Sequence, residues 1–148
     1  MKIILRIILP LLFTASLHAA AISGDIQLKY SESFGSGEGF RKEFGDVVKA
    51  SCNWSAADFF GQETVFATVT LTNTGPKAMF YNYYVAFFDK DNNLVGSAGQ
   101  GSFGDAGLKP GGNVQLGSCL IHLPPDKYKE ITSYKAVLYE TDIPPKKK

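Results

Sequence analysis

The stretch Thr64-Val-Phe-Ala-Thr-Val-Thr-Leu-Thr-Asn73 decides the fold class of this chain. Its residues fall into two alternating sets, which are Val65, Ala67, Val69 and Leu71 on the one hand and Phe66, Thr68, Thr70 and Thr72 on the other. A period of two places such sets on opposite faces of a β-strand that is buried on one side. We therefore predict a strand over 64–73, with the valine and leucine set in the core and the threonines outside.

Segments on both sides of this strand also have a composition typical of strands. We predict strands over 47–54, 79–89, 93–102, 114–123 and 134–139. Turn signals separate them, namely Gly75-Pro76, Asp91-Asn-Asn93 and Lys109-Pro-Gly-Gly112. The glycine-rich segment 93–102 is expected at a sheet edge or with a bulge, and 124–131 with one helical turn. Short strands between regular turns indicate an all-β, antiparallel β-sandwich of about seven strands.

The N-terminal end has the pattern of a secretory signal peptide. Lys2 and Arg6 precede the apolar run Ile7–Phe13, and the small residues Ala19-Ala-Ala21 follow. The apolar run is too short to span a bilayer comfortably. Cleavage after Ala21 would remove 21 of the 148 residues and leave 127. Because no cysteine stands at the cleavage site, we expect no lipid anchor, and we predict a periplasmic or secreted protein.

Composition then divides the chain into four parts. We predict a signal peptide over 1–21, a lead-in segment with a flexible Gly/Ser loop over 22–46, the β-sandwich domain over 47–142 and a basic tail over 143–148. The formal charge of the whole chain is +1, and loss of Lys2 and Arg6 leaves 13 basic and 14 acidic residues, a net charge of −1. With no excess of positive charge, we expect no nucleic-acid partner.

Two cysteines, Cys52 and Cys119, lie in predicted strands. An even pair in an exported chain usually closes into a disulfide, because the compartment is oxidising. Closing a ring of this length would stabilise the fold by roughly 4 kcal/mol through chain entropy. We therefore predict one structural disulfide, Cys52–Cys119.

Three local motifs resemble the FxLYD family and related immunoglobulin-like domains of bacterial envelope proteins. Val69-Thr-Leu-Thr-Asn-Thr-Gly75 is similar to the strand that ends in an Asn-x-Gly turn. Val85–Gly96 is similar to a strand, an acidic turn and a return strand, with Phe87-Phe-Asp89 at the position that gives the family its name. Leu108-Lys-Pro-Gly111 and Ile131–Lys135 are similar to the starts of the next two strands.

The resemblance covers residues 65–137, about half the chain. It implies an immunoglobulin-like sandwich, and it brings no shared catalytic residues. The chain departs from the family at Asn93, where the acidic turn usually has glycine. The first 40 or so residues after the predicted cleavage site and the cysteine pair lie outside the resemblance.

Catalytic and metal-binding patterns are weak. His122 is the one histidine of the predicted mature chain, and no G-x-S-x-G motif accompanies it. Asp89, Asp91 and Asn93 have the opening spacing of a calcium loop, but Leu94 and Gln100 stand where its glycine and bidentate glutamate belong. We expect an acidic hairpin turn there, no metal, no cofactor and no enzymatic activity. Asn53-Trp-Ser55 is a glycosylation sequon, which is relevant only in a eukaryotic secretory pathway.

Aromatic residues are the unusual resource of the sequence, with eleven Phe, seven Tyr and one Trp. The run Met79–Phe88 places large residues on both faces of one strand, although a sandwich strand usually offers one face to water. Two assignments stay open. Either Tyr81 and Tyr83 lie outside, or Phe80, Tyr84 and Phe88 do. The outer set is either covered by the lead-in segment, through Phe40, Phe44, Phe59 and Phe60, or it is a binding surface.

We take Tyr81, Tyr83 and Trp54 as candidate binding residues, because tyrosine and tryptophan combine apolar area with a polar tip. The leading hypothesis is an exported, non-catalytic β-sandwich that binds another envelope or secreted protein. A carbohydrate-binding module that stacks exposed aromatics on sugar rings is the alternative, and a small secreted hydrolase is the second alternative.

Overall fold

The computed structural model describes residues 18–31, 40–59, 61–102, 107–124 and 126–144; at 18, 31, 40–41, 59, 62, 67 and 116–122 it describes the backbone alone. The described residues form nine β-strands and one 3₁₀ turn, η1. In chain order these are β1 (His18–Asp25), β2 (Tyr30–Ser31), β3 (Phe40–Phe44), β4 (Val48–Phe59), β5 (Gln62–Asn73), β6 (Phe80–Phe88), β7 (Leu94–Gly101), β8 (Asn113–His122), η1 (Lys127–Glu130) and β9 (Ser133–Thr141).

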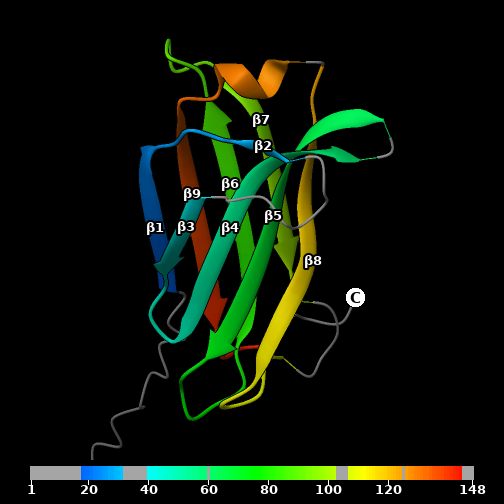
Figure 1. Cartoon of the computed structure of the whole chain (residues 1–148). Helices are drawn as coiled ribbons and strands as arrows, with labels where there is room; N and C mark the ends of the chain where they lie inside the picture. Colours follow the sequence, from blue (N-terminus) through cyan, green and yellow to red (C-terminus); the bar gives the residue numbers. More distant parts are fainter. Residues whose placement is uncertain (1–17, 32–39, 60, 103–106, 125, 145–148) are drawn as a thin grey trace, which may run out of the picture.

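The strands form two sheets that pack face to face (Figure 1). Sheet A has four strands in the order β1-β9-β6-β7, and all of its pairings are antiparallel. Sheet B has the order β2-β4-β5-β8, and β3 also pairs with β4. The prediction of an all-β sandwich is therefore confirmed. None of the described segments is a helix long and apolar enough to span a membrane.

The alternation in β5 has the predicted consequence. Val65, Val69 and Leu71 are buried, and Thr68, Thr70 and Thr72 are half-buried; Phe66, which the alternation placed in the threonine set, is buried as well, at 3% exposed. The side chain of Ala67 lies outside the described set. The register between β5 and β8 shifts between Ala67 and Val69, where a bulge interrupts the ladder.

The predicted turn at Lys109–Gly112 is present, with glycine at the position that has a positive φ. Gly111 has φ 68°, and the Gly112 amide donates to the Lys109 carbonyl over 2.9 Å. With Pro110 before it, this is the pattern of a type II turn, which requires a residue that tolerates positive φ. Strand β7 is an edge strand, and its register with β6 shifts between Phe87 and Phe88, as the glycine content predicted.

The lead-in segment is more ordered than its sequence pattern indicated. Residues 22–46 contain part of β1 and all of β2 and β3, and Ile26 and Phe44 are buried in the core. The flexible Gly/Ser loop predicted within this segment spans residues 31–39, which lie almost wholly outside the described residues. Strand β1 also begins before the predicted cleavage site, since His18–Ala21 pair with β9. The partner of β1 is distant in sequence, whereas β3 forms a hairpin with β4, in which Phe44 lies opposite Ala50.

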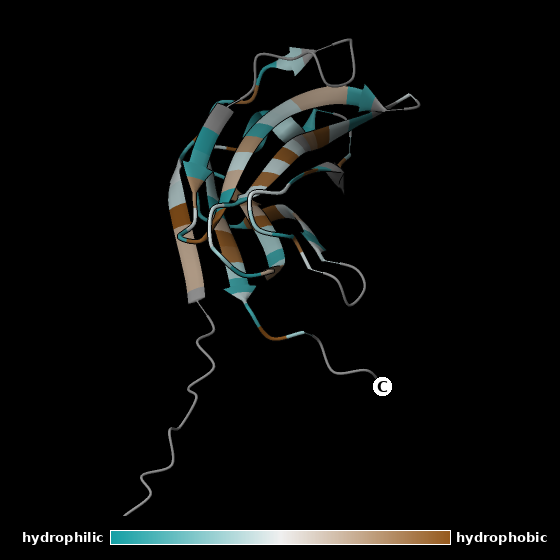
Figure 2. Cartoon of the chain, turned by 90° about the horizontal axis from the view of Figure 1, so that it is seen from below, coloured by the Kyte–Doolittle hydropathy of each residue, from teal (hydrophilic) through white to brown (hydrophobic). Residues whose placement is uncertain are grey.

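Aromatic side chains fill the space between the sheets. The Trp54 indole donates from Nε1 to the Tyr83 hydroxyl over 3.1 Å, which joins β4 of sheet B to β6 of sheet A. The Trp54 ring also meets Phe87 edge-on at 5.9 Å and Tyr134 at 4.7 Å between ring centroids. Burial raises the pKa of the Tyr134 phenol, and the neighbouring Cys52 raises it further. Figure 2 shows the matching pattern, with apolar and polar bands that alternate along the strands.

A buried carboxylate makes a second bridge between the sheets. Glu140 of β9 is only 1% exposed, and its Oε1 accepts the Val47 amide at 3.0 Å. Its other oxygen accepts the Val48 amide, where β4 begins. Two backbone donors of sheet B are thus satisfied by one side chain of sheet A. Charge-assisted bonds of this kind are among the stronger ones in proteins.

The predicted Cys52–Cys119 disulfide is not confirmed. Cys52 of β4 is buried and pairs with Val69, and Cys119 of β8 pairs with Ala67, so that β5 lies between the two cysteines. Two strand spacings separate their backbones by roughly 10 Å, whereas a disulfide needs Cα atoms within about 7 Å. Among the described residues no disulfide is formed. The even cysteine count gave no information on which strands would be neighbours.

We expect Val69→Asp to destabilise the protein by about 4 kcal/mol, because it places an unpaired charge in the apolar interior. Thr70→Asp, one position away on the outer face, should cost less than about 1 kcal/mol. Chemical denaturation of both variants measures the difference. The reverse ranking would contradict the register of β5.

Glu140→Gln should lower the free energy of unfolding by about 2 kcal/mol, because the amide loses the charge and offers only one acceptor for the two backbone donors. The exposed Glu43 on β3 provides the control, since Glu43→Gln should change stability by less than about 0.5 kcal/mol. Equal effects in denaturant titrations would show that the Glu140 bridge does not stabilise the fold.

Candidate functional site

The outer face of sheet A presents the most accessible aromatic surface of the described residues. Tyr84 of β6 is 51% exposed and Tyr139 of β9 is 39% exposed. Their rings meet edge to face, with centroids 6.4 Å apart and planes at 72°. The strand register pairs Tyr84 with Val137 and Asn82 with Tyr139, which makes the two tyrosines diagonal neighbours. We call this pair the tyrosine ridge.

The backbone of the edge strand holds Tyr84 in place. Gly99 of β7 lies opposite Tyr84, and a Cβ atom at Gly99 would stand 2.5 Å from Cδ1 of the Tyr84 ring. The ring therefore leans over a strand position that only glycine leaves open. Such a contact covers the glycine backbone and gives an exposed ring a defined orientation.

A shallow apolar groove lies on one side of the ridge, toward the top of sheet A. It has a volume of about 500 Å³. Tyr84, Phe88 and Val137 contribute side chains to it, and the small residues Ala86, Ser97 and Gly99 on the same face leave it open. Lys135 stands at its border, with Nζ 5.0 Å from the centroid of the Phe88 ring, a cation–π geometry. Leu94, which is 61% exposed, pairs with Phe88 at the end of β7.

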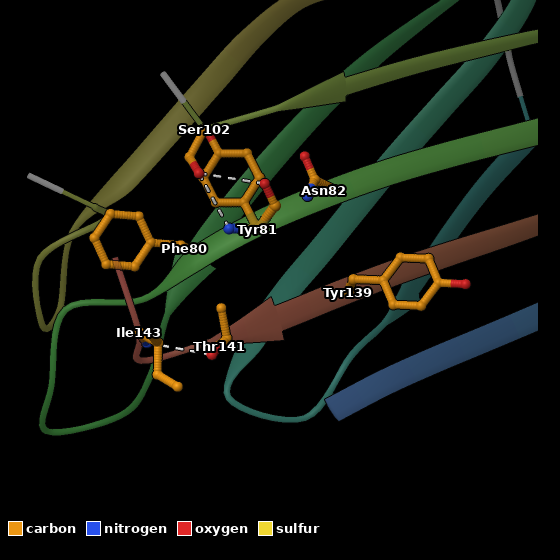
Figure 3. Close-up of a pocket in the computed structure, with 7 residues that line it drawn as sticks. All are labelled: Phe80, Tyr81, Asn82, Ser102, Tyr139, Thr141 and Ile143. Atoms are coloured by element: carbon orange, nitrogen blue, oxygen red, sulfur yellow. Dashed lines mark hydrogen bonds between the residues drawn. The ribbon is translucent and has the colours of Figure 1, made fainter. Parts of the chain in front are cut away.

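A smaller hollow of about 220 Å³ lies near the other end of the strands (Figure 3). Tyr139 and Thr141 of β9, Asn82 of β6 and Ser102 after β7 offer polar groups around it. The apolar part comes from Phe80, Tyr81 and the exposed Ile143. The tyrosine ridge thus separates a mostly apolar groove from a mixed hollow on the same face of the molecule.

The three predicted binding residues, Tyr81, Tyr83 and Trp54, are all buried. Tyr83 and Trp54 are fully buried, and Tyr81 is 7% exposed. Burial also raises the pKa of the Tyr81 phenol. Trp54 and Tyr83 lie in the core, where a partner in solution cannot reach them, whereas Tyr81, although buried, lines the hollow of about 220 Å³ (Figure 3). Of the two open assignments, the one with Phe80, Tyr84 and Phe88 outside has the correct register, but only Tyr84 and Phe88 are accessible, because Phe80 is buried at 7% exposed.

The lead-in segment does not cover this outer face through Phe44, because Phe44 packs inside the sandwich with its ring 6.3 Å from that of Tyr83. Phe60 lies outside the described residues, as do the side chains of Phe40 and Phe59.

Sequence patterns contained a signal for the correct assignment. In β6 the polar Asn82 and the small Ala86 have the same parity as Tyr84, which marks their face as the outer one. In β9 the charged Lys135 has the same parity as Val137 and Tyr139, which indicates that these two residues also lie on the outer face. Tyr139 was missed because its strand was assigned without regard to its faces.

Catalytic and metal-binding arrangements receive no support from the described part of the chain. In that part no three His, Cys, Asp or Glu side chains gather as a metal site would require. The side chain of His122 lies outside the described set. The Asp89–Asn93 segment forms a hairpin turn, in which the Asp89 carboxylate accepts the amides of Asp91 and Asn93 at 2.9 and 2.8 Å. Asn92 has φ 62°, as its turn position requires.

Comparison of the chain with protein-family models, with curated proteins and with solved structures returned no match.

We expect the pKa of Asp89 to lie below the ordinary value of 3.8, chiefly because the Asn93 side chain and backbone donate to the ionised form. A lowered pKa means that the carboxylate supports the turn above the ordinary value and loses this effect as the pH falls through the folded pKa. NMR titration of the Asp89 carboxyl carbon measures it. Asn93→Ala should shift the pKa upward, and an Asp89 pKa at or above 3.8 in the unaltered protein would contradict the turn geometry.

Proposed function

We propose that this protein is an exported, non-catalytic β-sandwich that binds another envelope or secreted protein through the outer face of sheet A. The observation that carries this proposal is the tyrosine ridge. Tyr84 and Tyr139 expose large rings beside a groove of about 500 Å³. Aromatic residues are enriched at protein interfaces, and they supply much of the binding energy there.

The character of the groove favours a protein partner. Its floor combines apolar side chains with small ones, and Lys135 is its one charged lining residue among those described. Low charge at the centre and polar groups at the border are typical of interface cores. The hydroxyls of Tyr84 and Tyr139 can stay hydrated or bind a partner at little cost, because they stand at the tips of their side chains.

Strand order supports an immunoglobulin-like fold for this domain. The pairings β4-β5-β8 and β9-β6-β7 follow the A-B-E and F-C-C′ orders of immunoglobulin sheets, in the same chain order. Strand β1 then takes the edge position next to β9. An FxLYD-like envelope domain is consistent with this order and with the signal-peptide pattern of residues 1–21.

A carbohydrate-binding module is the second candidate, and the mixed hollow beside Tyr139 is the observation that favours it (Figure 3). The ridge itself argues for the protein partner, because sugar rings stack on flat, coplanar aromatic faces. The planes of Tyr84 and Tyr139 stand at 72° to each other. They offer no continuous platform across the two rings.

Tyr84→Ala should weaken capture of the partner at least tenfold, because it removes a large exposed ring from the centre of the proposed interface. The measurement is a pull-down from envelope extract with the mature chain, followed by an affinity measurement with the protein recovered. Tyr30→Ala is the matched control, since Tyr30 is 42% exposed on β2 of sheet B.

A partner that binds the Tyr84→Ala and Tyr30→Ala variants equally well would overturn the assignment of this face. Retention of the mature chain on immobilised polysaccharides, lost in Tyr139→Ala and without any captured protein, would favour the carbohydrate-binding alternative instead.

A further inference from the structure

Strand β1 crosses the predicted processing site of the signal peptide. It pairs with β9 over eight residues, from His18 opposite Glu140 to Asp25 opposite Ser133. Hydrolysis of the Ala21–Ile22 amide by signal peptidase adds one water, and it leaves a carboxylate on Ala21 and a new amine on Ile22. The four residues His18–Ala21 leave with the signal peptide, and the other half of β1 stays.

His18–Ala21 cannot be paired with β9 and accessible to signal peptidase at the same time. A segment held in a sheet ladder is protected from proteolysis, whereas a processing site has to be accessible. The strand is suited to displacement, because its first half is mostly alanine and its second half contains Gly24, both unfavourable in strands. Ala19 and Ala21 are exposed, and Ala20 alone of these three packs partly against the core.

Cleavage therefore uncovers a defined piece of sheet edge. Ile22–Asp25 can still cover Ser133–Ala136, but Val137–Glu140 lose their neighbour on that side. Leu138 and Glu140, fully buried in the intact sheet, then lie at an open edge. An open edge with free ladder groups readily accepts an added strand.

We propose that processing of the signal peptide turns the Val137–Glu140 edge of β9 into a strand-addition site, and that an extended segment of a partner protein occupies it. This inference rests on the export and partner binding proposed above, and it specifies how the partner is held. The added strand runs antiparallel to β9, because β1 does.

The displaced half of β1 serves as a template for the occupant. Its residue opposite Leu138 is Ala20, which packs against the core, so this position takes a small apolar side chain. Its residues opposite Tyr139 and Val137 are Ala19 and Ala21, which lie on the outer face. Larger side chains at these two positions would contact the tyrosine ridge. Main-chain bonds thus give affinity, and the ridge gives specificity.

A peptide with the sequence of residues 14–21, labelled with a fluorophore, is the probe. Fluorescence anisotropy should show saturable binding to the mature chain, residues 22–148, and binding at least tenfold weaker to the full chain, in which β1 already covers the edge. Two further peptides carry one N-methyl group each, at the residue corresponding to Ala19 or to Ala20. Alternate amides of an edge strand point toward the sheet, so one methyl group should weaken binding about tenfold and the other should not.

Several outcomes would overturn the inference. These are no binding to the mature chain, equal binding to both chains, and equal effects of the two N-methyl groups. A mature chain that forms a dimer which the peptide cannot dissociate would show that a second copy occupies the edge. Loss of capture in Tyr84→Ala with no peptide binding would leave the proposed function intact and reject strand addition. The expected pattern of peptide binding, with no partner protein captured, would support strand addition and count against the proposed function.

Discussion

The hydrogen bond from Trp54 to Tyr83 is the contact on which the rest of this structure depends. It joins β4 to β6 across the interior, and it lies among the rings of Phe87 and Tyr134. Because side chains alternate along a strand, placing Tyr83 inside forces Tyr84 outside. One buried pair thus sets the register of the aromatic strand, and it decides which tyrosine a partner can reach.

Glu140 joins the two sheets in a similar way near the end of the sandwich. Its carboxylate satisfies the amides of Val47 and Val48 where β4 begins, and it therefore couples β9 to the neighbouring sheet. On the opposite face of the same strand, Tyr139 stands in the tyrosine ridge. Strand β9 carries the buried Glu140 on its inner face and Tyr139, a residue of the proposed binding surface, on its outer face; the edge that β1 covers is the proposed site of strand addition. Stability and binding are thus assigned to different faces of one strand.

The proposed binding surface consists of a few aromatic, small and charged side chains. It has two tyrosines whose ring planes stand at 72°, a groove with small residues on its floor, and one lysine beside Phe88. The tyrosine and phenylalanine rings are of the kind enriched at protein interfaces. Their arrangement on one face of sheet A, next to an edge that strand β1 covers, is what favours an extended protein segment as the proposed ligand.

The sequence by itself determined the strands that alternate clearly, as β5 shows, and the turns whose residues require special backbone angles, such as Gly111 and Asn92. These features depend on local sterics and on period-two burial, which neighbours in the chain express directly. Only the tertiary structure decided that β5 separates Cys52 from Cys119, that Tyr81 and Tyr83 lie inside, and that β1 pairs with β9. Each of these depends on which distant strands become neighbours, and the free energy of packing two whole sheets, rather than any local pattern, makes that choice.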